Sequence, residues 1–262
     1  MARLSVNLNK IALLRNSRRT GVPDLLPFVS VARDAGAQGI TLHPRPDERH
    51  IRRTDVTAIS RLMAPWRPGF ELNLEGYPDE RFLDIVREVR PEQCTLVPDA
   101  PGVLTSDKGW DLDPQQKALV QSALQTLKGI GCRVILFIDP DPSIPERVAD
   151  IQADGVEIYT GSYAEAFRRG NYTEALEAYA VTGQRAAERG LTLNVGHDLN
   201  LHNLPPLVTA LPDLAEASIG HELTADALML GFEEAVRRYA AALARRSADV
   251  SNTGEFSPAA PG

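Results

Sequence analysis

Short runs of aliphatic and β-branched residues recur along the chain, and longer segments with helical spacing lie between them. The short runs predict eight β-strands, at residues 3–8, 39–43, 70–76, 94–99, 133–139, 155–161, 191–197 and 216–221. In the intervening segments apolar residues recur three or four positions apart, and many segments end on Gly just before the next strand, as helix C-termini often do. These segments predict helices within residues 23–37, 54–63, 78–90, 113–131, 143–155, 171–190, 203–214 and 224–246.

This alternation predicts an α/β fold, a (β/α)8 TIM barrel that uses most of the 262 residues in one domain. A doubly wound open sheet is the structural alternative. We expect the barrel domain to cover residues 1–246, and the Ser, Gly and Pro-rich segment 247–262 to be a disordered C-terminal tail. The loop at residues 98–114 is long for a strand-to-helix connection, and such loops in barrels usually serve the active site.

The amino-acid composition argues against some classes of binding partner. The chain is 43% hydrophobic, enough for a full core, and its 28 basic and 35 acidic residues give a net charge of -7. This balance argues against a general nucleic-acid-binding protein or one that binds an anionic membrane, so any anion must be bound by a local cluster. The N-terminal sequence lacks the apolar segment of a secretory signal, and no run of about 18 apolar residues occurs, which indicates a cytoplasmic protein. Cys94 and Cys132 each stand at the start of an apolar run and are expected to be buried thiols.

Polar and titratable residues gather where the predicted strands end. Four of the five histidines lie at a strand end or in the loop after one: His43, His50, His197 and His221. The strand ends also carry Asn7, Arg45, Asn73, Glu75, Asp99, Asp139, Glu157, Thr160, Asn194 and Gly220. Because the C-terminal ends of barrel strands meet on one face, where catalytic groups project, these side chains are expected to converge on one site.

These residues also have structural interpretations. A single His at a strand end is more often a hydrogen-bonded structural residue, although the accumulation of histidines favours a site. Glu75 follows an apolar run, so burial can raise its pKa into the range of a general base; the alternative is an ion pair with Arg45. We expect Arg15 and Arg19 on a solvated face. Mutual ion pairing is the alternative for Asp47, Glu48 and Arg49.

The sequence favours a phosphate site over a metal site. It has no His-Glu-x-x-His, no His-x-His at the first strand end and no paired Cys motif, and it also lacks a Gly-rich dinucleotide fingerprint and a Walker loop. By contrast, "NVGHD" and "SIGHE" end the last two strands, where barrels commonly bind phosphate through backbone N–H groups. Gly196 and Gly220 in these motifs permit close approach of a ligand.

Several motifs together resemble one known family. "VNLNKIALLRNSR", "GITLHPRPDERHI", "NLEGYP", "TLVPD", "LNVGHDL" and "SIGH" look like the motifs of the pyridoxine 5'-phosphate synthases, in the same order, over about residues 3–240. The resemblance implies a (β/α)8 barrel with extra helices, usually assembled as a homo-octamer built from dimers. It also implies the condensation of two small phosphorylated substrates, 3-amino-2-oxopropyl phosphate and 1-deoxy-D-xylulose 5-phosphate. The implied products are pyridoxine 5'-phosphate, phosphate and water, and no metal or organic cofactor is expected.

The resemblance assigns roles to residues of this chain. His43 and Glu75 match the family's proton acceptors, and His197 its proton donor. The positions that hold the aminooxopropyl phosphate match Asn7, Arg18, Gly220 and His221. The positions that hold the deoxyxylulose phosphate match Arg45, His50 and Thr105. Imine formation, enolisation, loss of water and loss of phosphate all move protons, so two bases and an acid suit this chemistry.

The chain departs from the commonest family pattern at several positions. Asn9 and Lys10 stand where the family usually has Asp-His, and Asp198 stands where Gly usually follows the proton donor. Pro44 replaces a Leu, and Asp226 replaces an Arg. We expect Asn9, Lys10 and Asp198 still to contact substrate. Lys10 can bind the deoxyxylulose phosphate as a cation, whereas Asp198 suits a phosphate site only through its backbone N–H.

Two other functions stay open. A barrel aldolase or isomerase acting on another phosphosugar is favoured by a Schiff-base Lys inside a strand, but no predicted strand interior carries Lys. A non-catalytic paralogue that binds a phosphorylated metabolite is disfavoured because His43, Glu75 and His197 are present together.

Overall fold

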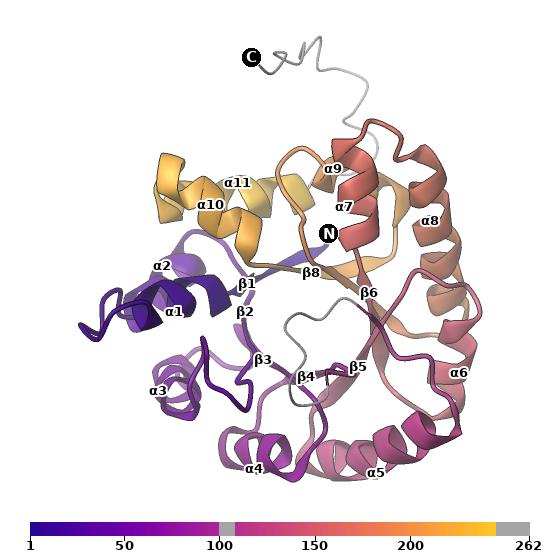
Figure 1. The fold of residues 1–262 in the computed structure, drawn as a ribbon, viewed down its shortest axis with the longest axis horizontal. Helices are drawn as coiled ribbons and strands as arrows, with labels where there is room; N and C mark the ends of the chain where they lie inside the picture. Colours follow the sequence, from indigo (N-terminus) through magenta and orange to yellow (C-terminus); the bar gives the residue numbers. More distant parts are fainter. Residues whose placement is uncertain (100–107, 245–262) are drawn as a thin grey trace.

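Eight parallel strands close into a barrel in sequence order in the computed structural model, which describes residues 1–99 and 108–244 (Figure 1). The strands are β1 (Arg3–Asn7), β2 (Gly39–Leu42), β3 (Glu71–Gly76), β4 (Gln93–Leu96), β5 (Arg133–Ile138), β6 (Gly155–Tyr159), β7 (Thr192–Gly196) and β8 (Leu214–Ile219). Each predicted strand matches one of these. The barrel is therefore confirmed, and the open doubly wound sheet is excluded by the pairing of β1 with β8.

Helices surround the barrel on the outside (Figure 1). They are α1 (Asn9–Asn16), α2 (Leu26–Asp34), α3 (Arg53–Met63), α4 (Glu80–Val89), α5 (Pro114–Ile130), α6 (Ile144–Asp150), α7 (Gly161–Arg168), α8 (Thr173–Glu188), α9 (Leu204–Ala210), α10 (His221–Leu230) and α11 (Phe232–Ala244). Helices α1 and α7 were not among those predicted from apolar spacing. The segment 224–246, predicted as one helix, is divided between α10 and α11 at Gly231, whose φ is 81°.

Local sequence explains where several helices begin and end. The side chain of Asp79 accepts a hydrogen bond from the backbone N–H of Phe82 at the start of α4. Asp113 caps α5 in the same way, and Pro114 takes the first helical position, where no N–H is needed. Helix α5 ends at Gly131, whose φ of 95° suits the left-handed C-cap conformation.

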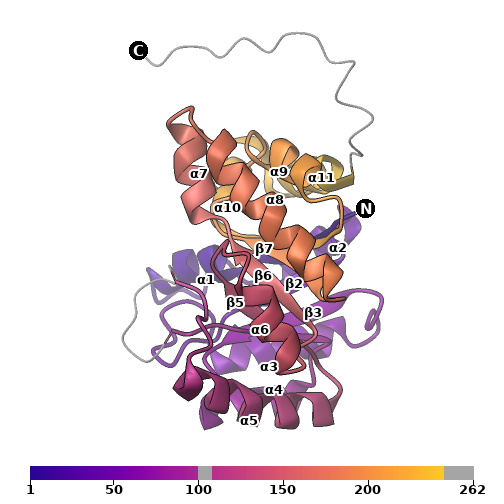
Figure 2. The same cartoon turned by 90° about the vertical axis from the view of Figure 1, so that its right-hand side faces the viewer.

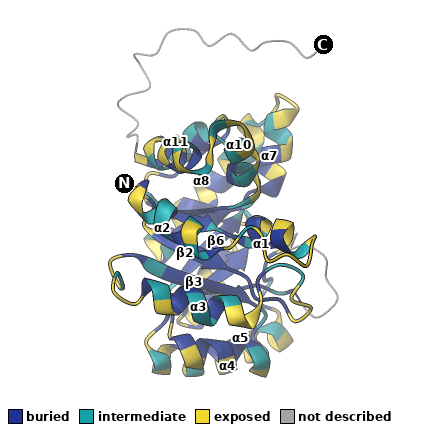
Figure 3. Ribbon diagram, turned by 90° about the vertical axis from the view of Figure 1, so that its left-hand side faces the viewer, coloured by how far each residue is buried: buried dark blue, intermediate teal, exposed yellow. Residues whose placement is uncertain are grey.

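The helices bury one face against the strands and expose the other. Figure 2 shows α6 and α8 on the outside of the strands, and both pack against β6. Figure 3 shows dark blue strands and inner helix faces, with the exposed positions on the outer faces of the helices. This covering explains why strands such as β5 (RVILFI) are apolar along their length rather than alternating, since a parallel sheet of this kind is buried on both faces. Among the described residues, no helix has the length and apolarity needed to cross a membrane.

The barrel interior is unusually polar. Ser5 and Thr41 share a hydrogen bond of 2.6 Å, and Asn73 donates to the hydroxyls of Thr41 and Thr95 at 3.3 and 3.2 Å. Nearer the N-terminal ends of the strands, Gln93 donates to Glu216 at 3.0 Å. Barrel interiors are more often filled by Val, Ile and Leu, so these hydrogen-bonded layers form a polar floor beneath the strand ends. Both cysteines are buried free thiols, as predicted. The expected tail at residues 247–262 lies outside the described residues.

Candidate active site

A cavity of about 450 Å³ opens at the C-terminal ends of the strands. It is lined by Asn7, Asn9, Lys10, Leu13, His43, Arg45, Arg49, His50, Glu75, Val97, Phe137, Glu157, His197, Asp198, Ser218, Gly220 and His221. Of the residues to which the sequence assigned a catalytic or substrate-binding role, the structure brings together all except two. Arg18 is exposed beyond the end of α1 and does not line the cavity, and Thr105 lies outside the described residues. Five other strand-end residues that were expected to converge do not line the cavity: Asn73, Asp99, Asp139, Thr160 and Asn194.

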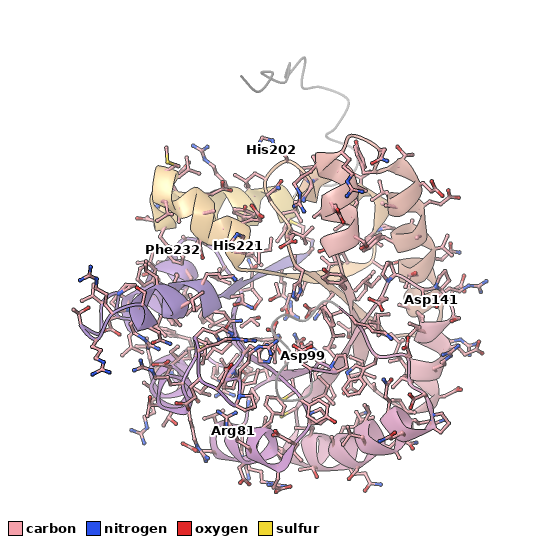
Figure 4. The ribbon with its side chains drawn as sticks, viewed as in Figure 1. Arg81, Asp99, Asp141, His202, His221 and Phe232 are labelled. Atoms are coloured by element: carbon pink, nitrogen blue, oxygen red, sulfur yellow. The ribbon has the colours of Figure 1, made fainter. Side chains whose placement is uncertain are left out.

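Figure 4 labels one residue that lines the cavity, His221, and one that follows the end of β4, Asp99. Asp99 points toward the centre of the ring, and His221 stands at the start of α10. His202, the one histidine that the sequence did not place near a strand end, lies at the periphery. The position of His221 brings the N-terminus of α10 to the cavity, where backbone N–H groups favour an anion.

Amide side chains from β1 and α1 connect the first three strands. The side-chain oxygen of Asn7 accepts a hydrogen bond from the backbone N–H of Asn9 at 3.0 Å. The side-chain oxygen of Asn9 accepts one from the backbone N–H of His43, also at 3.0 Å. Asn7 also directs its NH₂ group at Glu75, with 3.5 Å between nitrogen and oxygen. Asn9 therefore holds the backbone of His43, and Asn7 links Asn9 to the carboxylate of Glu75.

Glu75 is buried at the floor of the cavity. Burial raises its pKa to about 7, and the negative charge of Asp99 adds to this, whereas the charge of Arg45 and hydrogen bonds from Ser218 and Asn7 act in the opposite direction. This value confirms the expected direction of the shift. A carboxyl with a pKa near neutrality can both take and return a proton under physiological conditions, as a general base must.

Burial favours the neutral form of three histidines at the site, His43, His50 and His197. Burial, together with the charges of Arg45 and His50, lowers the pKa of His43 well below its ordinary value. Burial lowers the pKa of His197 as well, and lowers that of His50 to about 4. The Nδ1 atom of His50 accepts the backbone N–H of Ile51 at 2.9 Å, so a neutral His50 carries its proton on Nε2 and can donate it to a ligand. The Nδ1 atom of His43 lies 3.7 Å from Glu75 Oε2, close enough for these two groups to act on one substrate.

Arg45 forms a buried ion pair with Asp99. The acidic partner of Arg45 in the structure is therefore Asp99 rather than Glu75, the partner considered from sequence. The pair neutralises one of the cationic groups of the cavity. Arg49 and Lys10, which also line it, add positive charge at the same side.

Arg15 does not belong to a solvated face, and that prediction was wrong. Its guanidinium makes two bonds to Asp55, at 2.6 and 2.8 Å, and one to the carbonyl of His50 at 3.2 Å. The neighbouring Asn16 donates to the same carbonyl at 2.8 Å. Helix α1 thus holds the loop that carries His50. Arg19 is exposed, as expected, and Arg49 approaches Asp47 at 3.5 Å.

Two glycines at the ends of β7 and β8 make room for other groups. A Cβ on Gly196 would stand 2.2 Å from an oxygen of Glu157, and one on Gly220 would stand 3.0 Å from the Cβ of Asn7. Only glycine lets Glu157 reach the cavity floor at this point. The sequence placed Glu157 at a strand end but gave it no role; the signal was a carboxylate in an otherwise apolar strand.

His197 follows Gly196 directly and packs against two aromatic rings, whose own centroids are 5.7 Å apart. The ring centroids of Phe137 and Tyr159 are each 5.2 Å from that of His197. Phe137 was missed from sequence because an apolar residue in a buried strand carries no sign that it lines a site. The cavity thus offers an ionisable carboxyl, several neutral imidazoles and two groups of anion-binding atoms, which suits proton-transfer chemistry on phosphorylated substrates. No cluster of His, Cys, Asp or Glu suited to a metal ion was found in the part of the chain that the structure describes.

Comparison with known proteins matches residues 4–245 to the family model described as "Pyridoxal phosphate biosynthesis protein PdxJ". The chain is 47% identical to pyridoxine 5'-phosphate synthase of Porphyromonas gingivalis, over 91% of this chain and 98% of that protein. It is 48% identical to the protein of the same name from Brucella anthropi, over 93% and 99% of the two chains. The enzyme of Agrobacterium fabrum is 45% identical, over 94% and 99%.

Solved structures with lower sequence identity share the fold. Tryptophan synthase from M. tuberculosis superimposes with a TM-score of 0.63 at 11% identity, covering 92% of each chain. Phosphoribosyl anthranilate isomerase from Thermotoga maritima gives a TM-score of 0.56 at 12% identity, over 93% and 98% of the chains. At these identities the likeness supports the barrel architecture alone.

Proposed function

Because the chain belongs to the PdxJ family of pyridoxal phosphate biosynthesis proteins, we propose that it is a pyridoxine 5'-phosphate synthase. The proposed reaction joins 3-amino-2-oxopropyl phosphate to 1-deoxy-D-xylulose 5-phosphate and yields pyridoxine 5'-phosphate, phosphate and water. The observation that carries this proposal is the convergence of His43, Glu75 and His197 on one cavity, in a chain that is 47% identical to an enzymatic relative over 91% of its length.

Acid and base roles follow from the charge states of the free site. Glu75, with a pKa of about 7, accepts a proton from the carbon or nitrogen that loses one, and neutral His43 beside it accepts a second. His197 donates a proton to the departing water or phosphate. Since the pKa of His197 is low in the free protein, it becomes an acid only when the phosphate groups of the substrates arrive and stabilise its protonated form.

Two phosphate groups call for two anion sites, and the cavity provides one on each side. The amino substrate is assigned to the side formed by Asn7, Gly220 and His221, where α10 begins. The deoxyxylulose phosphate is assigned to Lys10, Arg45 and His50. Asn9 and Asp198 complete the proposed lining. Arg18 and Thr105 remain proposed substrate contacts on the basis of their motif positions alone.

The steps require only proton movements. The amine of one substrate and the ketone of the other form an imine with loss of water; loss of a proton from carbon then gives an enol, and further eliminations release water and inorganic phosphate. Closure of the ring makes the aromatic pyridine. No electron is transferred, so this route calls for no redox cofactor.

An aldolase that uses a Schiff-base Lys is the main rival function. None of the eight described strands carries Lys, but Lys10 lines the cavity from α1. Lys10 is therefore the residue through which an aldolase would have to act. A binding protein without activity is the other rival, and its cavity would need phosphate contacts but no carboxyl with a pKa near 7.

Incubation of the purified protein with both substrates, with detection of pyridoxine 5'-phosphate by its absorbance and mass, tests the proposal. Product should appear only when both substrates are present and should not require added metal. Conversion of deoxyxylulose phosphate alone would support an aldolase or isomerase. Binding of both phosphates without product would support the non-catalytic paralogue.

We also propose that the protein works in the cytoplasm as a homo-octamer built from dimers, with residues 1–246 as its catalytic domain. Exposed apolar side chains on α1 and α10 support association between copies: Leu13, Leu14, Leu228 and Met229 are 43 to 88% exposed. Helices α1 and α10 pack against each other, so these residues can form one surface. The two free thiols are consistent with a reducing compartment. Light scattering with Met229→Lys as a variant tests the assembly.

A further inference from the structure

The two residues after β7 have a backbone conformation that residues other than Gly rarely adopt. His197 has a φ of 85° and Asp198 a φ of 54°. Conformations in this region are unfavourable for residues with a Cβ and persist only where surrounding contacts hold them. The residue proposed as the proton donor thus stands in a turn that needs support from outside its own segment.

Thr160, at the end of β6, provides contacts to this turn. It is fully buried, and its hydroxyl lies within hydrogen-bond distance of the carbonyl oxygens of Gly196, at 2.6 Å, and of His197. Its backbone N–H also donates to the Gly196 carbonyl, at 2.9 Å. One side chain and one amide of β6 therefore hold two successive carbonyls at the end of β7.

Asn203, just before α9, holds the next carbonyl. Its side-chain NH₂ donates to the carbonyl of Asp198 at 2.9 Å, and its side-chain oxygen accepts the backbone N–H of Asn200 at 2.7 Å. Like Thr160 it is buried, with 1% of its surface exposed. The carbonyls of three consecutive residues, 196, 197 and 198, are thus each held by a side chain from another part of the chain.

These contacts determine where the N–H groups of the turn point. In a planar trans peptide the carbonyl and the following N–H point in opposite directions. Since the His197 carbonyl faces the Thr160 hydroxyl, the N–H of Asp198 points away from Thr160. Asp198 lines the cavity together with Gly220 and His221, which are assigned to the phosphate of the amino substrate. The arrangement lets the backbone of Asp198 serve an anion although its side chain is a carboxylate.

We propose that Thr160 is a positioning residue that fixes both the imidazole of His197 and the N–H of Asp198 for the amino substrate. The hydroxyl holds the backbone of the turn, while Phe137 and Tyr159 both pack against the imidazole ring. Thr160 itself does not line the cavity. This inference rests on the proposed function, which supplies the substrate. The contacts of Thr160 do not depend on that function.

Steady-state kinetics of Thr160→Val tests the proposal, since valine keeps the shape and removes the hydroxyl. We expect kcat to fall about tenfold and KM for 3-amino-2-oxopropyl phosphate to rise about five- to tenfold, the effect of losing one buried hydrogen bond. KM for deoxyxylulose phosphate should stay within about twofold. Thr160→Ser keeps the hydroxyl and should restore both constants to within about threefold of the wild type.

Thr182→Val is the matched control. Thr182 is also fully buried, and its hydroxyl donates to the carbonyl of Ala178 at 2.8 Å, but it lies within α8, away from the cavity. This variant makes the same chemical change and should leave all kinetic constants as in the wild type. It separates the loss of a buried hydroxyl from the loss of this particular contact.

Wild-type kinetic constants in Thr160→Val, or an equal rise in KM for both substrates, would overturn the proposal. If Thr160→Val does not fold, Asn203→Asp decides, because it keeps the oxygen that accepts from Asn200 and removes the donor to Asp198. It should raise KM for the amino substrate alone, and an unchanged KM would contradict the inference. An inactive wild-type protein would instead contradict the proposed function, so the two failures are distinguishable.

Discussion

Glu75 combines burial with a function that needs its charged form. Its carboxyl is desolvated and lies near Asp99, which together raise its pKa to about 7. Ordinary glutamates are ionised at neutral pH and make weak bases, whereas Glu75 is only partly ionised there and is correspondingly more basic. Its value as a base therefore depends on its burial and on the nearby charge of Asp99.

The pH dependence of kcat/KM should report this carboxyl. Glu75 must be ionised in the free protein to accept a proton, so activity should fall as the pH drops below about 7, losing about tenfold per pH unit. Glu75→Gln should abolish turnover while both phosphates still bind, because the amide keeps the shape of the side chain. A rate within about threefold of wild type in this variant would remove Glu75 from the mechanism.

Lys10 is expected to act as a charge rather than as a nucleophile. Lys10→Ala should raise KM for deoxyxylulose phosphate about tenfold or more, because a charge-assisted contact is lost, and should affect the amino substrate less. Lys10→Arg should keep measurable activity, since a guanidinium supplies the same charge. Lys117→Ala, an exposed change on α5, is the control. A borohydride-reduced adduct of deoxyxylulose phosphate on Lys10 would contradict this account and favour an aldolase.

For single residues, the sequence predicted most of those that converge on the cavity but not which acidic and basic side chains form ion pairs. Each residue at a strand end could be placed on the same barrel face, and the burial of Glu75 followed from its apolar neighbours. The partner of Arg45 is Asp99, 54 positions away, and local patterns do not record such pairings. The distance in sequence between Arg15 and Asp55 explains in the same way why Arg15 was assigned to the solvent.

Helix α1 joins the first strand to the loop after the second. Arg15 on α1 pairs with Asp55 in the first turn of α3 and also holds the carbonyl of His50. The side chains of the pair are only 8 and 14% exposed. This helix therefore contributes to stability and to the shape of the site together.

Arg15→Ala should lower the free energy of unfolding by about 3 kcal/mol, because it leaves Asp55 poorly solvated and without this partner. Arg19→Ala, an exposed change a few residues on, should alter it by less than about 0.5 kcal/mol. Urea denaturation of both variants measures the difference. Equal stability of the two variants would show that the Arg15 pair contributes nothing.

The elements themselves were predictable to different degrees. Strands were found because a barrel strand buried on both faces is a short, continuous apolar run. Helix α1 was missed because one of its three buried residues is Arg15, which breaks the apolar spacing. Helices α10 and α11 were predicted as one because apolar spacing continues across Gly231, and the change of direction depends on its positive φ.

Across the whole molecule, carboxyl groups buried in the barrel lower the stability of the fold at high pH, where burial opposes their ionisation. Burial, and then the charges of Glu75 and Glu216, raise the pKa of Glu157 well above its ordinary value. Burial raises the pKa of Glu216 too. A carboxyl with a pKa raised on folding stabilises the folded state while it is protonated, so its contribution is present below about pH 4.5 and is lost as the pH rises through the folded value.

Glu157→Gln should therefore stabilise the protein at high pH and not at low pH. Relative to wild type, we expect a clear gain in the free energy of unfolding at pH 8 and a much smaller one at pH 5, because the cost of keeping Glu157 protonated grows with pH between the unfolded and folded pKa values. Glu177→Gln, on the exposed face of α8, should show no such pH dependence. Urea denaturation at both pH values measures it, and a gain of equal size at pH 5 and pH 8 would disprove ionisation as the cause.

In the proposed function, one cavity joins two phosphorylated molecules and releases one of their phosphates. Phosphorus NMR of the purified protein with both substrates tests this most directly, because it follows both phosphorus atoms at once. The two substrate signals should decline together and be replaced in equal amounts by inorganic phosphate and by the monoester of pyridoxine 5'-phosphate, and neither substrate should change alone. Release of phosphate from a single substrate, or two unchanged signals in the presence of folded protein, would contradict it.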